Sequence, residues 1–169
     1  MGKVDTNKKL KENSLLKTAF EFFTTKGFSK TSITDIVSKA GVAKGTFYLY
    51  FKDKYDIRNK LVSHKSSQLF LTALSELGDE INELPFEEKL IRIIDNIINQ
   101  LNNDQSLLTF ISKNLSWGIF KNAITSPVSD KDVDFSTVYY NMLAESPNGF
   151  RAPEIMLFMI IELVSSTCY

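Results

Sequence analysis

Apolar residues recur along most of the chain with the spacing of an α-helix, in which positions i, i+3, i+4 and i+7 share one face. The first such stripe consists of Leu16, Ala19, Phe20 and Phe23, and Gly27 follows where a helix of this kind would end. The sequence contains no convincing run with the alternating pattern of a half-buried strand. The pattern therefore predicts an all-α fold.

Two shorter helices are predicted after Gly27. Ser32 can cap the start of the first of them, and Asp35 lies three residues further on, where a negative charge favours the helix start. Gly41 supplies the turn at the end of this helix, and another helix is expected over residues 43–51. Two helices joined by such a turn are typical of a helix-turn-helix motif, in which the later helix enters the major groove of DNA.

Longer helices are predicted in the rest of the chain. Asp53 would cap a helix over residues 54–80, and Pro85 would lie in the first turn of the next helix. The apolar residues of that fifth helix face nearly all round, which predicts a central position. The remaining helices, separated by the breakers TSPVSD and ESPNGFRAP, are expected over residues 104–123, over residues 130–145 and from Pro153 onward.

Charge is divided unevenly along the 169 residues, although the net charge is zero. Residues 1–65 hold 14 basic and 6 acidic residues, a net charge of +8, and residues 66–169 hold 6 and 14, a net charge of −8. A basic part joined to an acidic part suggests two tasks, one of them facing a polyanion. Chance clustering of charges on solvated faces would produce the same division.

The chemistry-bearing residues are few. One cysteine, Cys168, allows no internal disulfide and fits a reducing cytoplasm. With His64 as the single histidine, the chain has too few soft ligands for a zinc site of its own, and we expect His64 to be structural or exposed. The longest apolar run, Ile155 to Ile161, is far shorter than the roughly 20 residues that span a bilayer. We therefore expect a cytoplasmic protein with no metal and no cofactor.

The segment GVAKGTFYLYFKDK places four aromatic rings within five consecutive residues, with lysines on either side. Because a helix turns by about 100° per residue, Phe47 and Phe51 share one face, which can pack onto the two preceding helices. The flanks of that face carry polar groups, namely Lys44 with Tyr48 on one side and Thr46 with Tyr50 on the other. The phenylalanines would hold the helix while the tyrosines carry a hydroxyl outward.

The segment AFEFFTTKGFSKTSITDIVSKAGVAKGTFYLYFKDKYDI, residues 19–57, resembles the DNA-binding domain of the TetR/AcrR family of bacterial transcriptional regulators. The matching motifs are the Gly-Phe after the first helix, Thr-Ser-Ile before the second, Ala40-Gly41-Val42, and Gly-Thr-Phe-Tyr-x-Tyr-Phe-x-x-Lys. The resemblance implies a helix-turn-helix DNA-binding domain over residues 1–52 and a helical ligand-binding and dimerisation domain over residues 53–169. The fourth helix would link the two.

The same resemblance assigns DNA contacts residue by residue. Thr46, Tyr48 and Lys54 would contact phosphates, whereas Thr34 and Lys44 stand where relatives read base edges. Gly45 matches a small residue at a close backbone approach, Tyr50 would face DNA, and Ser32 completes the set. Phosphate contacts set position and salt dependence, and base contacts set sequence choice.

Each assignment has an ordinary alternative. Tyr48 would pack against the first helix, the lysines would be plain surface residues, and Thr34 would be a plain helix residue. Leu49 departs from the polar choice expected at its position, and it would touch a thymine methyl or cover its own core. The leading segment KVDTNKKLKE would reach the DNA backbone or form a frayed, solvated tail.

Ring-bearing and methionine-bearing helices supply the candidates for an effector pocket in the acidic part. These candidates are Phe70, Phe110, Trp117, Phe120, Tyr139, Tyr140, Met142 and Phe158. Trp117 and Tyr140 are favoured because a buried ring with a polar end can orient a ligand, but aromatic stripes are as typical of a core. Asp95 and Glu162 would meet a cationic effector or lie on a less buried edge.

Dimerisation in the family uses the last two helices. The helix from Pro153 would be one of them, with Met156, Met159, Ile160 and Leu163 as its apolar face. The sequence stops at Tyr169 in apolar, helix-like residues, so either this helix ends there or a final helix is missing.

The resemblance implies a homodimeric repressor, not an enzyme, that a small-molecule effector releases from a double-stranded DNA operator. Effector binding would tilt the fourth helix, so that the two reading heads no longer match consecutive major grooves. One alternative is a helical ligand-binding protein or enzyme that has kept only the scaffold. Another is a nonspecific nucleic-acid binder that uses the basic part alone.

Overall fold

The structure, a computed structural model, describes residues 3–125, 135–146 and 149–167. Every regular element in these ranges is a helix, which confirms the all-α prediction. The chain divides into two compact units, residues 1–62 and 63–169. The division falls inside helix α4, which runs from Lys54 to Leu77.

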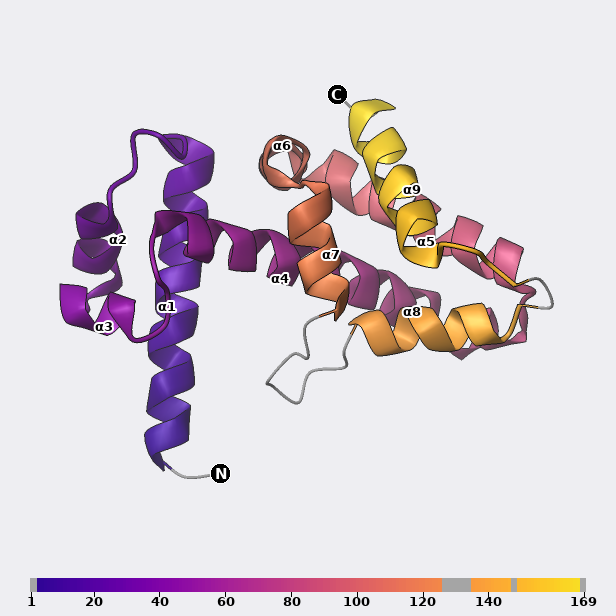
Figure 1. The fold of residues 1–169 in the computed structure, drawn as a ribbon, viewed down its shortest axis with the longest axis horizontal. Helices are drawn as coiled ribbons and strands as arrows, with labels where there is room; N and C mark the ends of the chain where they lie inside the picture. The colour runs from indigo at the N-terminus through magenta and orange to yellow at the C-terminus, as the bar shows by residue number, and fades with distance from the viewer. Residues whose placement is uncertain (1–2, 126–134, 147–148, 168–169) are drawn as a thin grey trace. The chain divides into compact units, whose positions relative to one another are not determined.

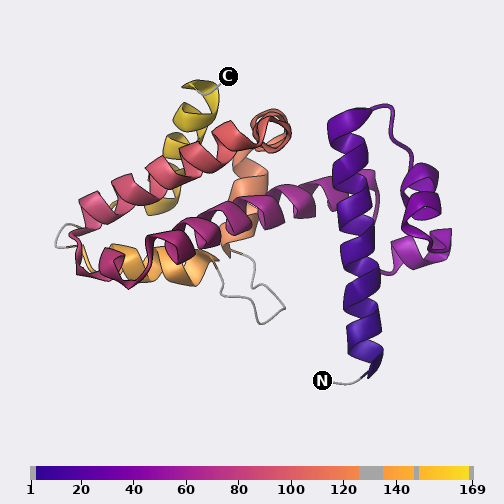
Figure 2. The ribbon, with the colours of Figure 1, turned by 180° about the vertical axis from the view of Figure 1, so that it is seen from behind.

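The first unit is built from α1 (Lys3–Thr25), α2 (Ile33–Ala40), α3 (Lys44–Tyr48) and the start of α4. Figures 1 and 2 both show α2 and α3 beside α1. The buried apolar residues of the unit come from all of these helices and from the turn after α3: Leu15, Ala19, Phe23, Ile36, Val37, Phe47, Phe51, Ile57, Leu61 and Val62. The leading segment KVDTNKKLKE belongs to α1, so the expectation of a frayed tail is wrong.

The ends of α2 follow the expected capping chemistry. The Ser32 hydroxyl accepts a hydrogen bond from the Asp35 amide at 3.0 Å, and Asp35 Oδ2 accepts from the Ser32 amide at 2.9 Å. This reciprocal pair satisfies two amide groups at the helix start. Gly41 ends the helix with a φ of 69°, a left-handed conformation that favours glycine. Both predictions are confirmed.

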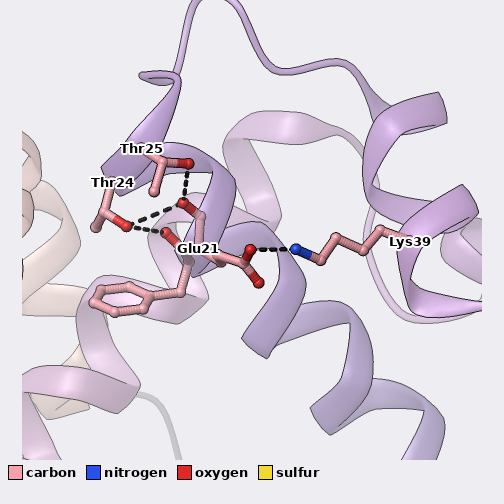
Figure 3. Close-up of polar contacts among 5 residues, drawn as sticks. Glu21, Thr24, Thr25 and Lys39 are labelled. Carbon is pink, nitrogen blue, oxygen red and sulfur yellow. Dashed lines mark hydrogen bonds and ion pairs between the residues drawn. The ribbon is translucent and has the colours of Figure 1, made fainter.

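An ion pair between Lys39 and Glu21 joins α2 to the last turns of α1 (Figure 3). The hydroxyls of Thr24 and Thr25 donate to the main-chain carbonyl oxygen of Glu21 at 3.1 and 2.7 Å, next to the α1 end. Because both side chains of the ion pair are nearly half exposed, water screens it, and we expect it to contribute at most about 1 kcal/mol. The apolar core therefore holds these helices together.

The ends of α3 and α4 differ from the predicted residues 51 and 80. α3 ends at Tyr48 instead of residue 51, because the amides of Leu49 and Tyr50 bond three residues back and tighten the chain. Asp53 caps α4 as predicted, since its Oδ1 accepts from the amides of Tyr55 and Asp56 at 2.7 and 2.9 Å. α4 ends before Gly78, whose φ is 65°, and a 3₁₀ helix, η1 (Asp79–Glu83), follows.

The second unit contains α5 (Phe86–Asn103), α6 (Gln105–Asn114), α7 (Trp117–Thr125), α8 (Phe135–Ala144) and α9 (Pro153–Thr167). α6 contacts α5 and α9, and α7 contacts α8 and α9. The single helix predicted over residues 104–123 is wrong: Leu115 adopts an extended conformation, with a ψ of 135°, and separates α6 from α7. The predicted start of the next helix, residues 130–134, lies outside the described residues.

The central position predicted for α5 is also wrong. One face of the helix is buried, through Phe86, Lys89, Ile93 and Leu101. Ile91 on the opposite side is 65% exposed. Glu88 and Arg92, both exposed, form an ion pair along that outer face. Charged side chains favour solvent, so this face of α5 is solvent-exposed. Pro85 precedes the first helical residue instead of lying within the first turn.

Among the described residues, no helix is long and apolar enough to cross a membrane.

Candidate functional site

α3 is anchored by Phe47, within the helix, and by Phe51, in the turn that follows it. Phe47 is completely buried and Phe51 is 1% exposed, and their ring centroids lie 5.4 Å apart. Burying two such rings removes a large apolar area from water, which fixes the orientation of a helix of only five residues. The predicted role of the phenylalanines is confirmed.

The opposite side of α3 faces solvent. Lys44 and Gly45 are exposed, Tyr48 is 52% exposed, and Thr46 is half-buried. The Tyr48 ring meets Phe47 edge-on, with centroids 5.5 Å apart, so the ring is held on one side while half of the residue stays exposed. Thr34, on the neighbouring α2, is exposed as well. The structure thus brings five of the predicted DNA-binding residues onto α2 and α3 without burying them in the core.

Leu49, directly after α3, is 78% exposed. It therefore does not cover the core of its own unit, which removes one of the two roles expected for it.

The other three predicted DNA-binding residues make contacts within the first unit. Ser32 is engaged with Asp35, and the hydrogen bonds from the Ser32 amide and hydroxyl lower the pKa of the Asp35 carboxyl. The Tyr50 hydroxyl donates to the carbonyl oxygen of Lys8 in α1 at 3.1 Å. Each of these groups has a structural task, whatever else it contacts.

Lys54 is the most strongly engaged of the three. Its ammonium group donates to the carbonyl oxygens of Phe28 and Thr31, both at 2.9 Å, and lies 4.4 Å from the centroid of the Phe28 ring. These contacts fasten the loop between α1 and α2 to the start of α4. An ammonium group has three donors, so one more remains for an external acceptor such as a phosphate.

Sequence reasoning missed Lys60. Its ammonium group donates to the Tyr50 carbonyl oxygen at 2.9 Å and lies over the Phe51 ring, 4.9 Å from its centroid. Lys60 therefore supports the turn that follows α3. Nothing in the local pattern of α4 distinguishes this lysine from a solvated one, because its partners lie in another element.

The predicted effector residues fall into separate groups. Phe120, Tyr139 and Phe158 share one apolar cluster, and the Trp117 ring lies 5.3 Å from that of Phe158. Phe70 and Met142 belong to another cluster, formed by α4, η1, α5 and α8. Phe110 is buried on α6. The structure does not bring all eight residues around one space.

Tyr139 and Tyr140 both bond to the start of α9. The buried Tyr139 donates to the Pro153 carbonyl oxygen at 2.8 Å, and burial raises the pKa of its hydroxyl. Tyr140 donates to Glu154 Oε1 at 2.7 Å, and burial together with that hydrogen bond raises the pKa of Tyr140 to about 12. Trp117 and Tyr140 are 37% and 38% exposed, so neither is the buried ring that was expected.

A hollow of about 480 Å³ lies against α4, η1, α5 and α8. Of the predicted effector residues it includes only Met142. Its charged groups are Asp79, Glu145 and Lys89, and the Lys89 side chain is 3% exposed and forms an ion pair with Glu145. Lys89 was missed, although its spacing from Phe86 and Ile93 puts it on the buried face of α5. Asp95, Glu162 and His64 are exposed.

Comparison with known proteins places the first unit in a family. Residues 15–61 match the model for the bacterial regulatory proteins of the tetR family. The uncharacterized HTH-type transcriptional regulator YvdT of Bacillus subtilis is 34% identical over 90 residues, which are 53% of this chain and 43% of that protein. The fatty acid metabolism regulator protein of the same organism is 33% identical over 101 residues, 59% of this chain and 50% of its own length. The alignments thus span about half of these relatives.

Solved structures extend the likeness to both units. A putative tetR family transcription regulator from Shewanella sp. PV-4 superposes with a TM-score of 0.64 at 16% identity, over 94% of this chain and 83% of that one. FadR from Bacillus subtilis, solved in complex with stearoyl-CoA, gives a TM-score of 0.56 at 22% identity, over 92% and 83%. At these identities the similarity establishes the fold.

Proposed function

We propose that this chain, whose residues 15–61 match the bacterial regulatory proteins of the tetR family, is a homodimeric transcriptional repressor that leaves its operator when a small molecule binds the second unit. One observation carries the proposal. α3 is held from behind by Phe47 and Phe51, while Lys44 and Tyr48 remain in solvent. A short helix that is fixed on one side and polar on the other is suited to enter a major groove.

The proposed DNA-binding residues form two groups: those whose side chains have no polar partner among the described residues of the unit, and those that also hold the unit together. Thr46 and Tyr48 offer hydroxyls to phosphate oxygens, and Thr34 and Lys44 offer groups to base edges. Gly45 allows a close approach of the backbone. Ser32, Tyr50 and Lys54 act mainly by holding α2, the turn after α3 and the loop before α2 in place. We propose a DNA-binding domain of residues 1–52 and an effector and dimerisation domain of residues 53–169, with the first residues of α4, up to residue 62, packed in the same compact unit as the DNA-binding domain.

Dimerisation is assigned to α9. Ile155, Met159 and Leu163, spaced four residues apart, are 48%, 64% and 66% exposed. Met156 and Ile160, which the sequence also put on this face, are half-buried. An exposed apolar stripe on one helix is suited to pack against a second copy. Met159→Glu should therefore shift the chain toward monomer in sedimentation velocity, and an unchanged dimer would exclude this face.

The effector domain has two places where a ligand could act, the ring cluster of α7, α8 and α9 and the hollow beside Lys89. The effector shifts a population, so it must bind the free and the DNA-bound forms with different affinity. Since one structural relative was solved with stearoyl-CoA, that compound is the first effector to test, by its ability to release the protein from DNA.

The test of the regulatory function is sequence-specific binding. An operator is first selected from random duplexes, and Tyr48→Ala should then lose most of the affinity without unfolding. Tyr55→Ala is the matched control, because Tyr55 is an exposed tyrosine of the same unit that lies outside α2 and α3, in the first turn of α4. Undiminished affinity of Tyr48→Ala would refute the assignment.

Two further measurements separate the alternatives. Neutralising phosphates releases counterions, so affinity should fall steeply between low and physiological salt. Equal affinity for random and selected duplexes would instead favour a nonspecific nucleic-acid binder. Turnover of a metabolite would favour an enzyme on this scaffold. A repressor of this kind works on the chromosome, and we therefore place it in the cytoplasm.

A further inference from the structure

Leu49 is the most exposed large hydrophobic residue in the described part of the chain, at 78%. A single exposed leucine is ordinary on a protein surface. This one, however, ends the helix proposed to enter the groove, and its backbone is fixed by the hydrogen bond from its amide to the Thr46 carbonyl oxygen at 3.2 Å. Its position therefore makes Leu49 a candidate for direct contact with DNA, which other exposed leucines are not.

The surface beside Leu49 is open. Leu49 has helical backbone angles, φ −75° and ψ −23°, so its side chain leans toward the helix start, over Gly45 four residues earlier. Gly45 has no side chain, and a Cβ built there would meet nothing within 4 Å. Leu49 therefore lies on the same side of α3 as the open backbone of Gly45, and the exposed Lys44 and Tyr48 belong to the same short helix.

The charge around Leu49 restricts what can cover it. The segment of residues 1–65 carries a net charge of +8, and Lys44 and Lys52 near Leu49 are both exposed. A second copy of the same surface would be repelled, whereas a polyanion would be attracted. The occupant that fits is a DNA duplex.

Within a duplex, one base group suits a leucine. Leucine neither donates nor accepts hydrogen bonds, and covering a polar base edge with it would remove water without replacing the lost hydrogen bond. The C5 methyl group of thymine is the apolar group exposed in the major groove. This reasoning rests on the proposed DNA-binding function.

We propose that Leu49 is a specificity-determining residue that reads the C5 methyl group of a thymine in each operator half-site, beside the backbone surface left open by Gly45. The chain would therefore prefer thymine at that position over every base that lacks the methyl group, including deoxyuridine, which pairs in the same way.

The experiment replaces the thymines of the selected operator one at a time by deoxyuridine, which removes only the methyl group. For the wild-type chain we expect one position in each half-site where the replacement weakens binding by about fourfold, the value of one buried methyl group. Leu49→Ala should bind the thymine and deoxyuridine operators equally. Ile91→Ala, which alters an exposed apolar residue of the second unit (65%), should keep the wild-type preference.

A repeat of the selection with Leu49→Ser supplies a second readout. Serine is short and polar and offers no apolar group to a methyl, so thymine should no longer be preferred at that position. An operator without any position sensitive to deoxyuridine, a preference that persists in Leu49→Ala, or a selection in which Leu49→Ser still prefers thymine would overturn the assignment of Leu49 and leave the regulatory function intact. Failure to select any operator would instead remove the regulatory function itself, and the assignment with it.

Discussion

The ammonium group of Lys54, at the first residue of α4, donates a hydrogen bond to the carbonyl oxygen of Thr31, 2.9 Å away and 23 residues earlier in the chain. A second hydrogen bond of the same length reaches Phe28. A residue expected to contact DNA is thus also part of the structure that positions α2. Effects of its substitution on folding and on DNA binding must be separated.

Lys54 and Lys44 should therefore behave differently. Lys54→Met leaves two carbonyl oxygens without their charged donor, and we expect a loss of about 1–3 kcal/mol in the free energy of unfolding. Lys44→Met alters an exposed side chain and should leave that free energy unchanged while weakening operator binding. Urea unfolding and binding titrations on both variants measure the contrast. Equal stability of the two variants would contradict the structural role of Lys54.

Gly45→Ala should raise the stability of the protein while it lowers the affinity for the operator. The φ of Gly45 is not in the left-handed region, and an added Cβ has open space, so alanine should raise stability by about 0.4–1 kcal/mol through the unfolded state. If DNA approaches the backbone there, operator affinity should fall by about tenfold, or about 1.4 kcal/mol. A more stable variant with full affinity would exclude the close approach.

The capping box of α2 should make stability depend on acid pH. The amide and hydroxyl of Ser32 lower the pKa of Asp35 below its ordinary value of 3.8. Asp35 therefore contributes stability above pH 3.8, and this contribution is lost as the pH falls through its lowered pKa. Asp35→Asn should melt at a lower temperature than wild type at pH 7, and the difference should shrink below pH 3.8. A constant difference at all pH values would mean that the charge plays no part.

The hydrogen bond from Tyr50 to Lys8 should hold the start of α1. Tyr50→Phe keeps the ring and removes the donor. We expect faster amide hydrogen exchange in the first turns of α1, while the exchange of α2 stays as in wild type. The matched control is Tyr48→Phe. Tyr48 is half exposed, so the loss of its hydroxyl should leave amide exchange in α1 unchanged.

Removing the acidic partner of the Lys89–Glu145 ion pair should reduce stability more than removing the basic partner. Glu145→Gln leaves a buried ammonium group without its counter-charge and should cost about 1–2 kcal/mol, less than in a fully buried pair because the Glu145 side chain is 58% exposed. Lys89→Met replaces the cation by an apolar side chain among Phe86 and Ile93, and should stay within about 1 kcal/mol of wild type. Thermal melts of both variants and of the double variant test this. A larger loss for Lys89→Met would show that the cation itself stabilises the unit.

Short-range chemistry made much of the first unit predictable. Ser32, Gly41 and Asp53 act through atoms within a few residues, so their caps could be assigned from spacing alone. The same holds for the division between the buried phenylalanines and the exposed Tyr48 of α3. The second unit was less predictable, since the break at Leu115 and the exposure of Ile91 depend on what packs against each helix.

The sequence by itself therefore determined the helical class, the caps of the first helices and the ring-bearing surface of α3, because helical period and capping are local properties of the chain. Only the tertiary structure decided that Tyr50 reaches Lys8, 42 residues away, and that Lys89 meets Glu145, 56 residues away. Such pairs are created when helices pack, and the spacing of residues within one helix carries no record of which residue of another helix will lie opposite.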